Sequence, residues 1–230
     1  MAGQIVNHIW EIEKNQFFGF RMSEIKFKKE LVLFDLDGVL IDSKRNMELS
    51  WEKTCEVFGL NIDFNDYFSK IGRPFIDILN LLRVTKFQEE IEKTFNNSSI
   101  ELMDRIEVFP GVKETLNFIK NKGIKTGIVT SKNNEKTMKI LDNIGFDFDI
   151  VQTPNQVLKG KPSPDHILHA MSKLNINPRD VLFIGDMEVD CIAAYSANVD
   201  YAHADWGYGL CTKKNVINLK NIGDLKSKLL

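Results

Sequence analysis

The chain has 230 residues, with 30 lysines and arginines against 32 aspartates and glutamates, so its formal net charge at pH 7 is −2. This balance argues against an overall electrostatic field that attracts nucleic acid or an anionic membrane, and any preference for an anionic ligand must be local. The length suits one large domain, or a core with a smaller insert, that buries enough apolar surface for a stable interior.

The cysteine content indicates the compartment. Cys55, Cys191 and Cys211 are odd in number and lack the spacing of metal-binding or redox motifs, which favours a reducing cytoplasm over a disulfide framework. The sequence also lacks an apolar run of membrane-spanning length and a secretory leader. We therefore expect a cytoplasmic protein that acts without a membrane partner.

Residues 1–28 form an N-terminal extension ahead of any recognisable core. Ile5, Ile9 and Ile12 give this segment a short helical pattern. The extension is compatible with an added helix, an alternative translation start or an expression remnant, and the sequence does not decide between them.

Residues 31–34, LVLF, form a continuous apolar run of the kind found in parallel strands that are buried on both faces. Asp35 and Asp37 follow at the carboxyl end of this strand, where open parallel sheets bind ligands. A buried charge is costly unless it is paired or coordinates a metal. The two acids, with Asp42 nearby, therefore point to a site for a hard cation.

A helical segment interrupts the chain after this strand. From about Met47 to Arg105 the apolar residues recur with helical spacing, and no strand of comparable strength appears between them. We expect residues 46–105 to form a small helical cap, inserted into an α/β core made of residues 29–45 and 106–230.

Strands and helices alternate through the rest of the chain. The expected strands cover residues 124–130, 148–151 and 181–184, and the expected helices cover residues 112–122, 134–144, 164–174 and 189–197, the last ending at Asn198. This alternation predicts an α/β fold with a doubly wound, Rossmann-type parallel sheet that has helices on both faces.

Polar residues follow the predicted strands, and in a doubly wound sheet their ends converge on one crevice. Thr130 and Ser131 follow the second strand, Lys161 lies in the GKPSPD segment, and Asp186 and Asp190 lie in the GDMEVD segment. Acids, hydroxyls and a lysine in one crevice are typical of a metal-assisted phosphate site.

These motifs resemble those of the haloacid dehalogenase superfamily of phosphatases. FDLDGVLIDS is similar to its first motif, Thr130 in IVTSK to its second, Lys161 in GKPSPD to its third, and GDMEVD to its fourth. The resemblance covers roughly residues 30–215, with the motifs in order. The helical cap after the first motif resembles that of the subfamily that contains phosphoglycolate phosphatases and β-phosphoglucomutases.

The resemblance implies a role for each acid. Asp35 would attack phosphorus and become an aspartyl phosphate, while Asp37 would protonate the leaving alcohol and then deprotonate the attacking water. Mg²⁺ would be bound by Asp35, Asp186 and the backbone carbonyl of Asp37, with Asp190 as a direct ligand or just behind one.

The resemblance also implies that Thr130, Ser131 and Lys161 hold the transferring phosphoryl group. Some alternatives stay open on the residues alone. Asp190 and Ser131 could simply cap the helices that follow them, and Lys159 competes with Lys161. Glu188 is ambiguous as well, because some members of the family that the chain resembles have a metal-binding acid in this loop.

The substrate is expected to be a small phosphorylated metabolite. The resemblance implies a phosphate ester, because members of the superfamily that act on other substrates lack an acid at the position of Asp37. Arg73 in the cap could reach a substrate carboxylate or second phosphate, although it could equally be a solvated arginine at a helix start. WGYG at residues 206–209 resembles phosphoglycolate phosphatase-like members. The preceding YAHAD, however, is not a typical apolar strand, and Asn198 stands where relatives usually have glycine.

We therefore predict a Mg²⁺-dependent phosphatase, monomeric or homodimeric. The first alternative is a sugar phosphomutase of the β-phosphoglucomutase type, which uses the same core residues and differs through its cap. The second is a receiver-like phospho-signalling domain without turnover. In receivers the acceptor aspartate follows a middle strand of the sequence, whereas here Asp35 follows the first strong strand.

Overall fold

The protein is described by a computed structural model over residues 28–214 and 216–230. The predicted extension, residues 1–28, lies outside these described residues except for Lys28. Within the described part of the chain, no helix is both long and apolar enough to cross a membrane.

The centre of the molecule is a parallel sheet with the strand order β5-β4-β1-β6-β7-β8. Its strands are β1 (Leu31–Phe34), β4 (Lys125–Val129), β5 (Ile150–Gln152), β6 (Val181–Gly185), β7 (Asp200–Ala204) and β8 (Ile217–Leu219). Strand β1 lies between β4 and β6 and is fully buried, as its apolar run predicts.

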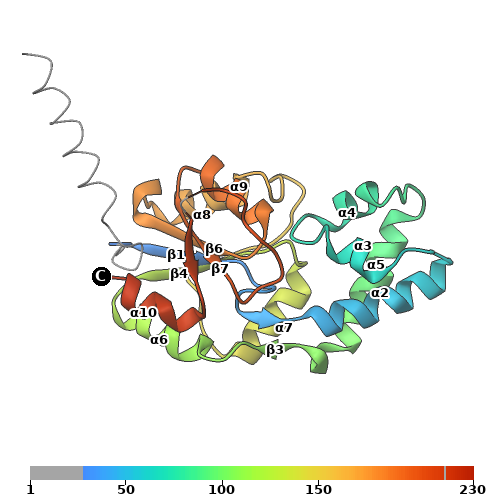
Figure 1. The fold of residues 1–230 in the computed structure, drawn as a ribbon, viewed down its shortest axis with the longest axis horizontal. Helices are drawn as coiled ribbons and strands as arrows, with labels where there is room; N and C mark the ends of the chain where they lie inside the picture. Colours follow the sequence, from blue (N-terminus) through green and yellow to red (C-terminus); the bar gives the residue numbers. More distant parts are fainter. Residues whose placement is uncertain (1–27, 215) are drawn as a thin grey trace, which may run out of the picture.

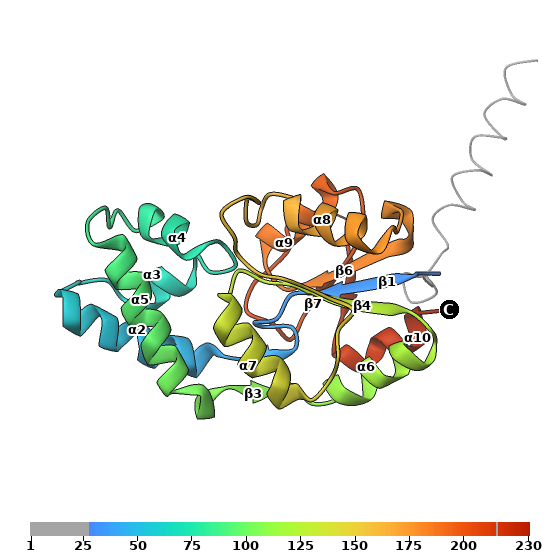
Figure 2. The ribbon, with the colours of Figure 1, turned by 180° about the vertical axis from the view of Figure 1, so that it is seen from behind.

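Helices cover both faces of the sheet (Figures 1 and 2). One face carries α6 (Val112–Asn121), α7 (Asn134–Ile144) and α10 (Leu225–Lys228), preceded by the 3₁₀ turn η4 (Ile222–Asp224). The other carries α8 (Asp165–Leu174) and α9 (Glu188–Ser196), with the 3₁₀ turn η3 (Pro178–Asp180) leading into β6. Along β1, Val32 and Phe34 face the first layer, while Leu31 and Leu33 face the second. The predicted doubly wound fold is confirmed.

Residues 44–105 form a separate group of helices, here called the helical insert. It contains α2 (Lys44–Phe58), α3 (Phe64–Phe68), α4 (Phe75–Leu81), α5 (Gln88–Glu101) and the 3₁₀ turn η2 (Met103–Arg105). Its own apolar core includes Trp51, which stacks on Tyr67 with ring centroids 4.4 Å apart. The two chain segments that join it to the sheet, β2 (Ile41–Asp42) and β3 (Glu107–Val108), pair as an antiparallel ribbon.

Two parts of the sheet differ from the sequence expectations. The first four residues of YAHAD, 201–204, belong to strand β7, although the pattern is not that of a typical apolar strand. Tyr201 and His203 are both buried there, and the hydroxyl of Tyr201 lies 3.2 Å from Nδ1 of His203. Strand β8 was not expected either. The left-handed turn at Asn198 is confirmed by its φ of 58°.

Candidate active site

The motif residues gather at the carboxyl ends of three neighbouring strands. Asp35 and Asp37 follow β1, Thr130 follows β4, and Asp186 follows β6. Lys161 reaches the same place from the segment between β5 and α8. The sheet order therefore brings together residues that are far apart in the sequence, as the crossover rule for parallel sheets predicts.

Three acids form a buried cluster at this edge. Asp35, Asp186 and Asp190 are each at most 3% exposed, and one carboxylate oxygen of each lies within 4.8 Å of the others. Burial raises the pKa of Asp35 to about 7, although the ammonium group of Lys161 acts against this rise. Burial also raises the pKa of Asp186 well above its usual value, and the charges of Asp190 and Asp35 add to the rise.

Lys161 links two of these acids. Its Nζ lies 2.9 Å from Oδ1 of Asp35 and 2.7 Å from Oδ1 of Asp190. Burial by itself would lower the pKa of Lys161, but the carboxylates of Asp190 and Asp35 raise it above the ordinary lysine value. The cluster therefore contains one fixed positive charge. The sequence allows either Lys159 or Lys161 to be the lysine of the site, and the structure places Lys161 in the cluster. The backbone amide of Lys159 instead donates a hydrogen bond to Asp165.

Asp190 also shapes the loop that precedes α9. Its Oδ2 accepts hydrogen bonds from the backbone amides of Met187 at 2.9 Å and Asp186 at 3.3 Å. Asp190 therefore caps the start of α9, as the sequence allows, and it also contacts Lys161. Glu188, the other acid of the loop, points elsewhere and accepts hydrogen bonds from the amide and hydroxyl of Thr212.

The donor set around Asp186 fits a hard divalent cation. Its Oδ2 accepts a hydrogen bond from the backbone amide of Tyr208 at 2.7 Å, while Oδ1 is buried and has no hydrogen-bond partner among the described residues. Buried carboxylate oxygens are almost always partnered, and an orphaned one beside two further acids marks a position for a cation. Asp35, Asp186 and, through its remaining coordination capacity, Asp190 could hold it.

Asp37 lies beside the acid cluster but is more accessible, with 20% of its side chain exposed. Its Oδ1 accepts a hydrogen bond from the hydroxyl of Ser43 and forms an ion pair with Nζ of Lys132 at 3.0 Å. The backbone amide of Ser43 is in turn bound to the phenol oxygen of Tyr208 at 2.7 Å. The carboxylate is therefore fixed in orientation while one side faces the cavity described next.

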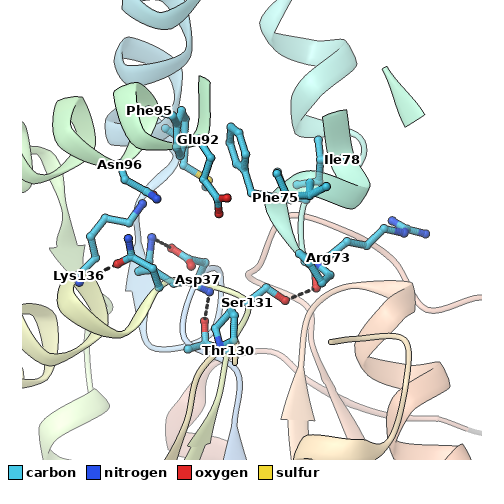
Figure 3. Close-up of a pocket in the computed structure, with 18 of the residues that line it drawn as sticks. Asp37, Arg73, Phe75, Ile78, Glu92, Phe95, Asn96, Thr130, Ser131 and Lys136 are labelled. Carbon is cyan, nitrogen blue, oxygen red and sulfur yellow. Dashed lines mark hydrogen bonds and ion pairs between the residues drawn. The ribbon is translucent and has the colours of Figure 1, made fainter. Parts of the chain in front are cut away.

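A cavity of about 460 Å³ lies between the sheet edge and the helical insert. Its floor includes Asp35, Asp37 and Thr130, and its far wall consists largely of apolar side chains of the insert, such as Phe75 and Ile78 (Figure 3). A volume of this size suits a small molecule, and polar groups converging on one end of an apolar cavity are typical of a substrate site.

The two hydroxyl residues after β4 occupy different positions. Thr130 is buried, and its Oγ1 accepts a hydrogen bond from the backbone amide of Lys132 at 3.1 Å. Ser131 donates from Oγ to the backbone carbonyl of Gly72 in the insert at 2.7 Å. The cap of α7 is Asn133, not Ser131, because the Asn133 side chain accepts from the amide of Lys136.

Arg73 lines the cavity, but its guanidinium group extends away from Asp37 (Figure 3). Nη1 lies 3.4 Å from the backbone carbonyl of Lys70. In this conformation the structure does not bring Arg73 together with the acids.

Sequence reasoning assigned no role to several residues of the cavity. Lys132 could have been found from its place directly after Thr130 and Ser131, at the end of the same strand. Lys136, Glu92 and Asn96 carry no such signal, because α5 of the insert and α7 of the core meet only in the folded chain.

Comparison with known proteins agrees with this geometry. The model of the family described as haloacid dehalogenase-like hydrolase matches residues 32–204. A phosphoglycolate phosphatase from Aquifex aeolicus is 34% identical over 182 residues, which cover 77% of this chain and 85% of that protein. The pyrophosphatase PpaX from Oceanobacillus iheyensis is 33% identical over 178 residues, which cover 76% of this chain and 83% of that protein.

Solved structures share the fold. A protein from Bacteroides fragilis assigned to the haloacid dehalogenase-like hydrolases aligns with a TM-score of 0.74 at 26% identity, covering 86% of this chain and 100% of that chain. CbbY from Rhodobacter sphaeroides, solved with phosphate, aligns with a TM-score of 0.75 at 19% identity, covering 86% of this chain and 96% of that chain, a likeness of fold alone. Together with the acid cluster, these matches show that the chain belongs to the haloacid dehalogenase-like hydrolase family, as one of its phosphatases.

Proposed function

We propose that the protein is a Mg²⁺-dependent hydrolase of small phosphomonoesters that works through an aspartyl-phosphate intermediate. The observation that supports this most directly is the buried Oδ1 of Asp186, which has no hydrogen-bond partner among the described residues and lies beside Asp35, a residue that lines a cavity of substrate size. A cation there would leave Asp35 ionised and next to the incoming phosphate.

Asp35 is the nucleophile in this proposal. One of its oxygens pairs with Lys161, and the other attacks phosphorus while the bond from phosphorus to the ester oxygen breaks. When bound, Mg²⁺ would offset the negative charge shared by Asp35 and the phosphate. Lys161 holds the Asp35 carboxylate in position during the attack and adds a positive charge beside the phosphoryl oxygens.

Asp37 is the general acid and base. It gives its proton to the departing alcohol oxygen and then takes a proton from the water that attacks the phosphorus of the aspartyl phosphate, which releases inorganic phosphate and regenerates Asp35. Ser43 and Lys132 orient its carboxylate for both steps. Thr130 and Ser131 lie at the cavity floor and rim, where their hydroxyl and backbone groups would bind phosphoryl oxygens.

We also propose that residues 46–105 act as a movable cap on a core of residues 29–45 and 106–230. The ribbon of β2 and β3 is the covalent link between the two, and the insert closes the cavity from above. Such a cap keeps bulk water from the phosphoryl group until the alcohol has left. With the insert closed over a substrate, a rotation of the Arg73 side chain would bring its guanidinium group toward a carboxylate or second phosphate of that substrate.

The substrate is a small ester of the phosphoglycolate kind in this proposal, because the phosphoglycolate phosphatase from Aquifex aeolicus is 34% identical to this chain over 182 aligned residues. A small metabolite, and neither nucleic acid nor a membrane, fits the cavity volume of about 460 Å³ and the net charge of −2. The three cysteines are free thiols, which suits the cytoplasm. We retain the expectation of a monomer or a homodimer.

The test is phosphate release from p-nitrophenyl phosphate and from a panel of metabolite esters, with and without Mg²⁺, for the wild type and Asp35→Asn. We expect turnover that needs Mg²⁺ and that Asp35→Asn abolishes, with folding checked by circular dichroism. Equal activity of the variant and the wild type would overturn the proposal. Transfer of phosphate within a sugar phosphate, without release of free phosphate, would instead support the mutase.

A further inference from the structure

One lysine of the cavity plays no part in the reaction described above. Lys136 lies in the first turn of α7, on the core side of the cavity, and is only 3% exposed. Figure 3 places it on the side of the cavity where Glu92 and Asn96 of α5 enter from the insert. Lysine is almost never buried to this extent without a partner of opposite charge.

Lys136 differs in this respect from the other lysine that lines the cavity. The ammonium group of Lys132 is paired with Asp37 at 3.0 Å. The ammonium group of Lys136 forms neither an ion pair nor a hydrogen bond with any described residue. It lies over the ring of Phe95 in a cation–π contact, with Nζ 5.0 Å from the ring centroid. A buried ammonium group that faces a cavity without a counter-ion would be stabilised by an anionic ligand.

The charges around Lys136 explain why the protein alone does not satisfy it. Burial lowers its pKa well below the ordinary lysine value, and repulsion from Lys132 lowers it further. Asp37 and Glu92 oppose this effect from a distance, since neither is within ion-pair contact. The pKa of Glu92 is itself raised by burial, and the positive charge of Lys136 opposes this rise.

We propose that Lys136 is a specificity-determining residue that binds a second anionic group of the substrate, a carboxylate or a second phosphate, at the junction of α7 and α5. The first turn of α7 favours an anion as well, because the backbone amides of a helix N-terminus point outward there. This inference rests on the proposed function and makes the substrate class more specific. The preferred substrate has a phosphoester at one end and a negative charge at the other.

The position in the cavity supports this substrate class. Asp35 and Asp37 lie at the floor, whereas Lys136 and Phe95 lie where α5 closes over the same cavity. A short substrate bound by its phosphate at the floor would therefore place its tail beside Lys136. The apolar ring of Phe95 keeps water away from that tail, which strengthens a charge-assisted contact.

The experiment compares matched substrates on the wild type and Lys136→Met. The substrates are 2-phosphoglycolate, which has a carboxylate tail, inorganic pyrophosphate, which has a second phosphate, and ethyl phosphate, whose tail is neutral. We expect Lys136→Met to lower kcat/KM about 10- to 100-fold for whichever anionic substrate the enzyme prefers, and less than about 3-fold for ethyl phosphate. The two anionic arms show which group is bound.

Three further variants serve as controls. Lys139→Met removes an exposed lysine of the same helix, paired with Glu135 at 2.8 Å, and should leave every substrate unaffected. Lys136→Arg keeps the positive charge and should restore part of the preference if the folded protein tolerates its size. Glu92→Gln removes the nearest acid on α5 and should not reduce the preference for an anionic tail.

The outcomes separate this inference from the proposed function. The inference would be overturned if Lys136→Met lowered kcat/KM by the same factor for all three substrates, or if Glu92→Gln lowered it as much as Lys136→Met does. Either result would show that the lysine only stabilises the contact between the insert and the core. Wild-type protein that hydrolyses none of the esters would instead overturn the proposed function. If Lys136→Met does not fold, Lys136→Gln is measured in its place against the same substrates.

Discussion

At the scale of single residues, Asp35 meets two opposing demands. A nucleophilic carboxylate must be ionised, but burial raises the pKa of Asp35 to about 7, and Asp186 beside it is shifted in the same direction. Lys161 supplies only one positive charge to the three acids of the cluster. Without a cation, the cluster therefore keeps part of its protons at neutral pH.

This gives a pH dependence for Mg²⁺ binding. Acids with raised pKa values are protonated below those values, so a cation must displace protons there, while above about pH 7 Asp35 is already ionised. Below about pH 7, we expect Mg²⁺ affinity to fall about tenfold for each unit by which the pH is lowered, for each proton released on binding. Above about pH 7, the affinity should depend less steeply on pH. Calorimetry in two buffers of different ionisation enthalpy measures the protons released.

The control for this measurement is Asp35→Asn, which lacks the titrating carboxylate. It should bind Mg²⁺ more weakly at pH 8 and release fewer protons at pH 6.5. An Mg²⁺ affinity that stays constant between pH 6 and pH 8 would contradict the prediction, because it would mean that Mg²⁺ binding displaces no protons from the acids.

The acids of the site could be predicted from the sequence, whereas Lys136 could not. Asp35, Asp37 and Asp186 each follow an apolar strand directly, and the ends of parallel strands converge whatever the rest of the fold does. Lys136 has its place in the cavity only because α5 of the insert packs over α7, and a contact between segments this distant leaves no local pattern.

At the scale of elements, two turns fix the side chain of Asp186. Gly38, in the turn after β1, has a φ of 77°, and a Cβ atom there would lie 2.1 Å from Oδ2 of Asp186. Gly207, after β7, approaches the same side chain from another direction, with a Cβ position 2.2 Å from the Cβ of Asp186. The absence of side chains at both turns is what allows the carboxylate to lie there.

Gly38→Ala should therefore damage the site beyond its effect on backbone strain. The added methyl group must displace Asp186, and we expect Mg²⁺ affinity and kcat to fall at least tenfold, as estimated from the loss of one charged ligand. The matched control is Gly59→Ala at the end of α2, where φ is 63° but nothing lies within 4 Å of the Cβ position. Both variants should lose about 1 kcal/mol of stability from the left-handed backbone.

Mg²⁺ titration and thermal unfolding of the two variants provide the measurement. A Gly38→Ala protein that binds Mg²⁺ as tightly as Gly59→Ala would show that Asp186 moves freely, and would contradict the role given to the turn.

Helices and strands that are determined by local residues could be predicted from the sequence, whereas those that depend on distant parts of the fold could not. Helix α7 begins and ends where the sequence predicts, because Asn133 caps its start and Gly145, with a φ of 65°, ends it. Strand β7 was not expected, since it carries polar residues such as His203, whose ring nitrogen contacts the hydroxyl of Tyr201 two residues earlier in the same buried strand. The ribbon of β2 and β3 has two residues in each strand, too few for any periodicity.

At the scale of the whole molecule, the insert and the core are two apolar interiors that meet over the cavity. The insert packs around Trp51 and Tyr67, and the core packs around the sheet. The contacts between them include the ring pair of Phe68 and Tyr208, with centroids 5.2 Å apart. Two bodies that each have their own apolar interior and are joined by a short ribbon can separate without unfolding either one.

Ser131 offers a direct test of this arrangement. Its hydroxyl donates to the carbonyl of Gly72 at 2.7 Å, a hydrogen bond between the loop after β4 and the insert. Ser131→Ala removes this bond, which is worth about 1 kcal/mol, and thereby favours the open arrangement of the insert. We expect KM to rise about threefold to tenfold, with a change in unfolding free energy of less than about 1 kcal/mol.

The control is Ser69→Ala, which removes a hydroxyl that bonds the carbonyl of Asp66 within the insert and so leaves the closure unaffected. Steady-state kinetics gives KM and kcat, and solvent viscosity tests whether opening limits turnover. A fall in kcat with KM unchanged would mean instead that Ser131 acts on the transferring phosphoryl group alone. The contact with Gly72 would then position the serine for chemistry, since an interaction made only in the transition state lowers kcat without weakening substrate binding.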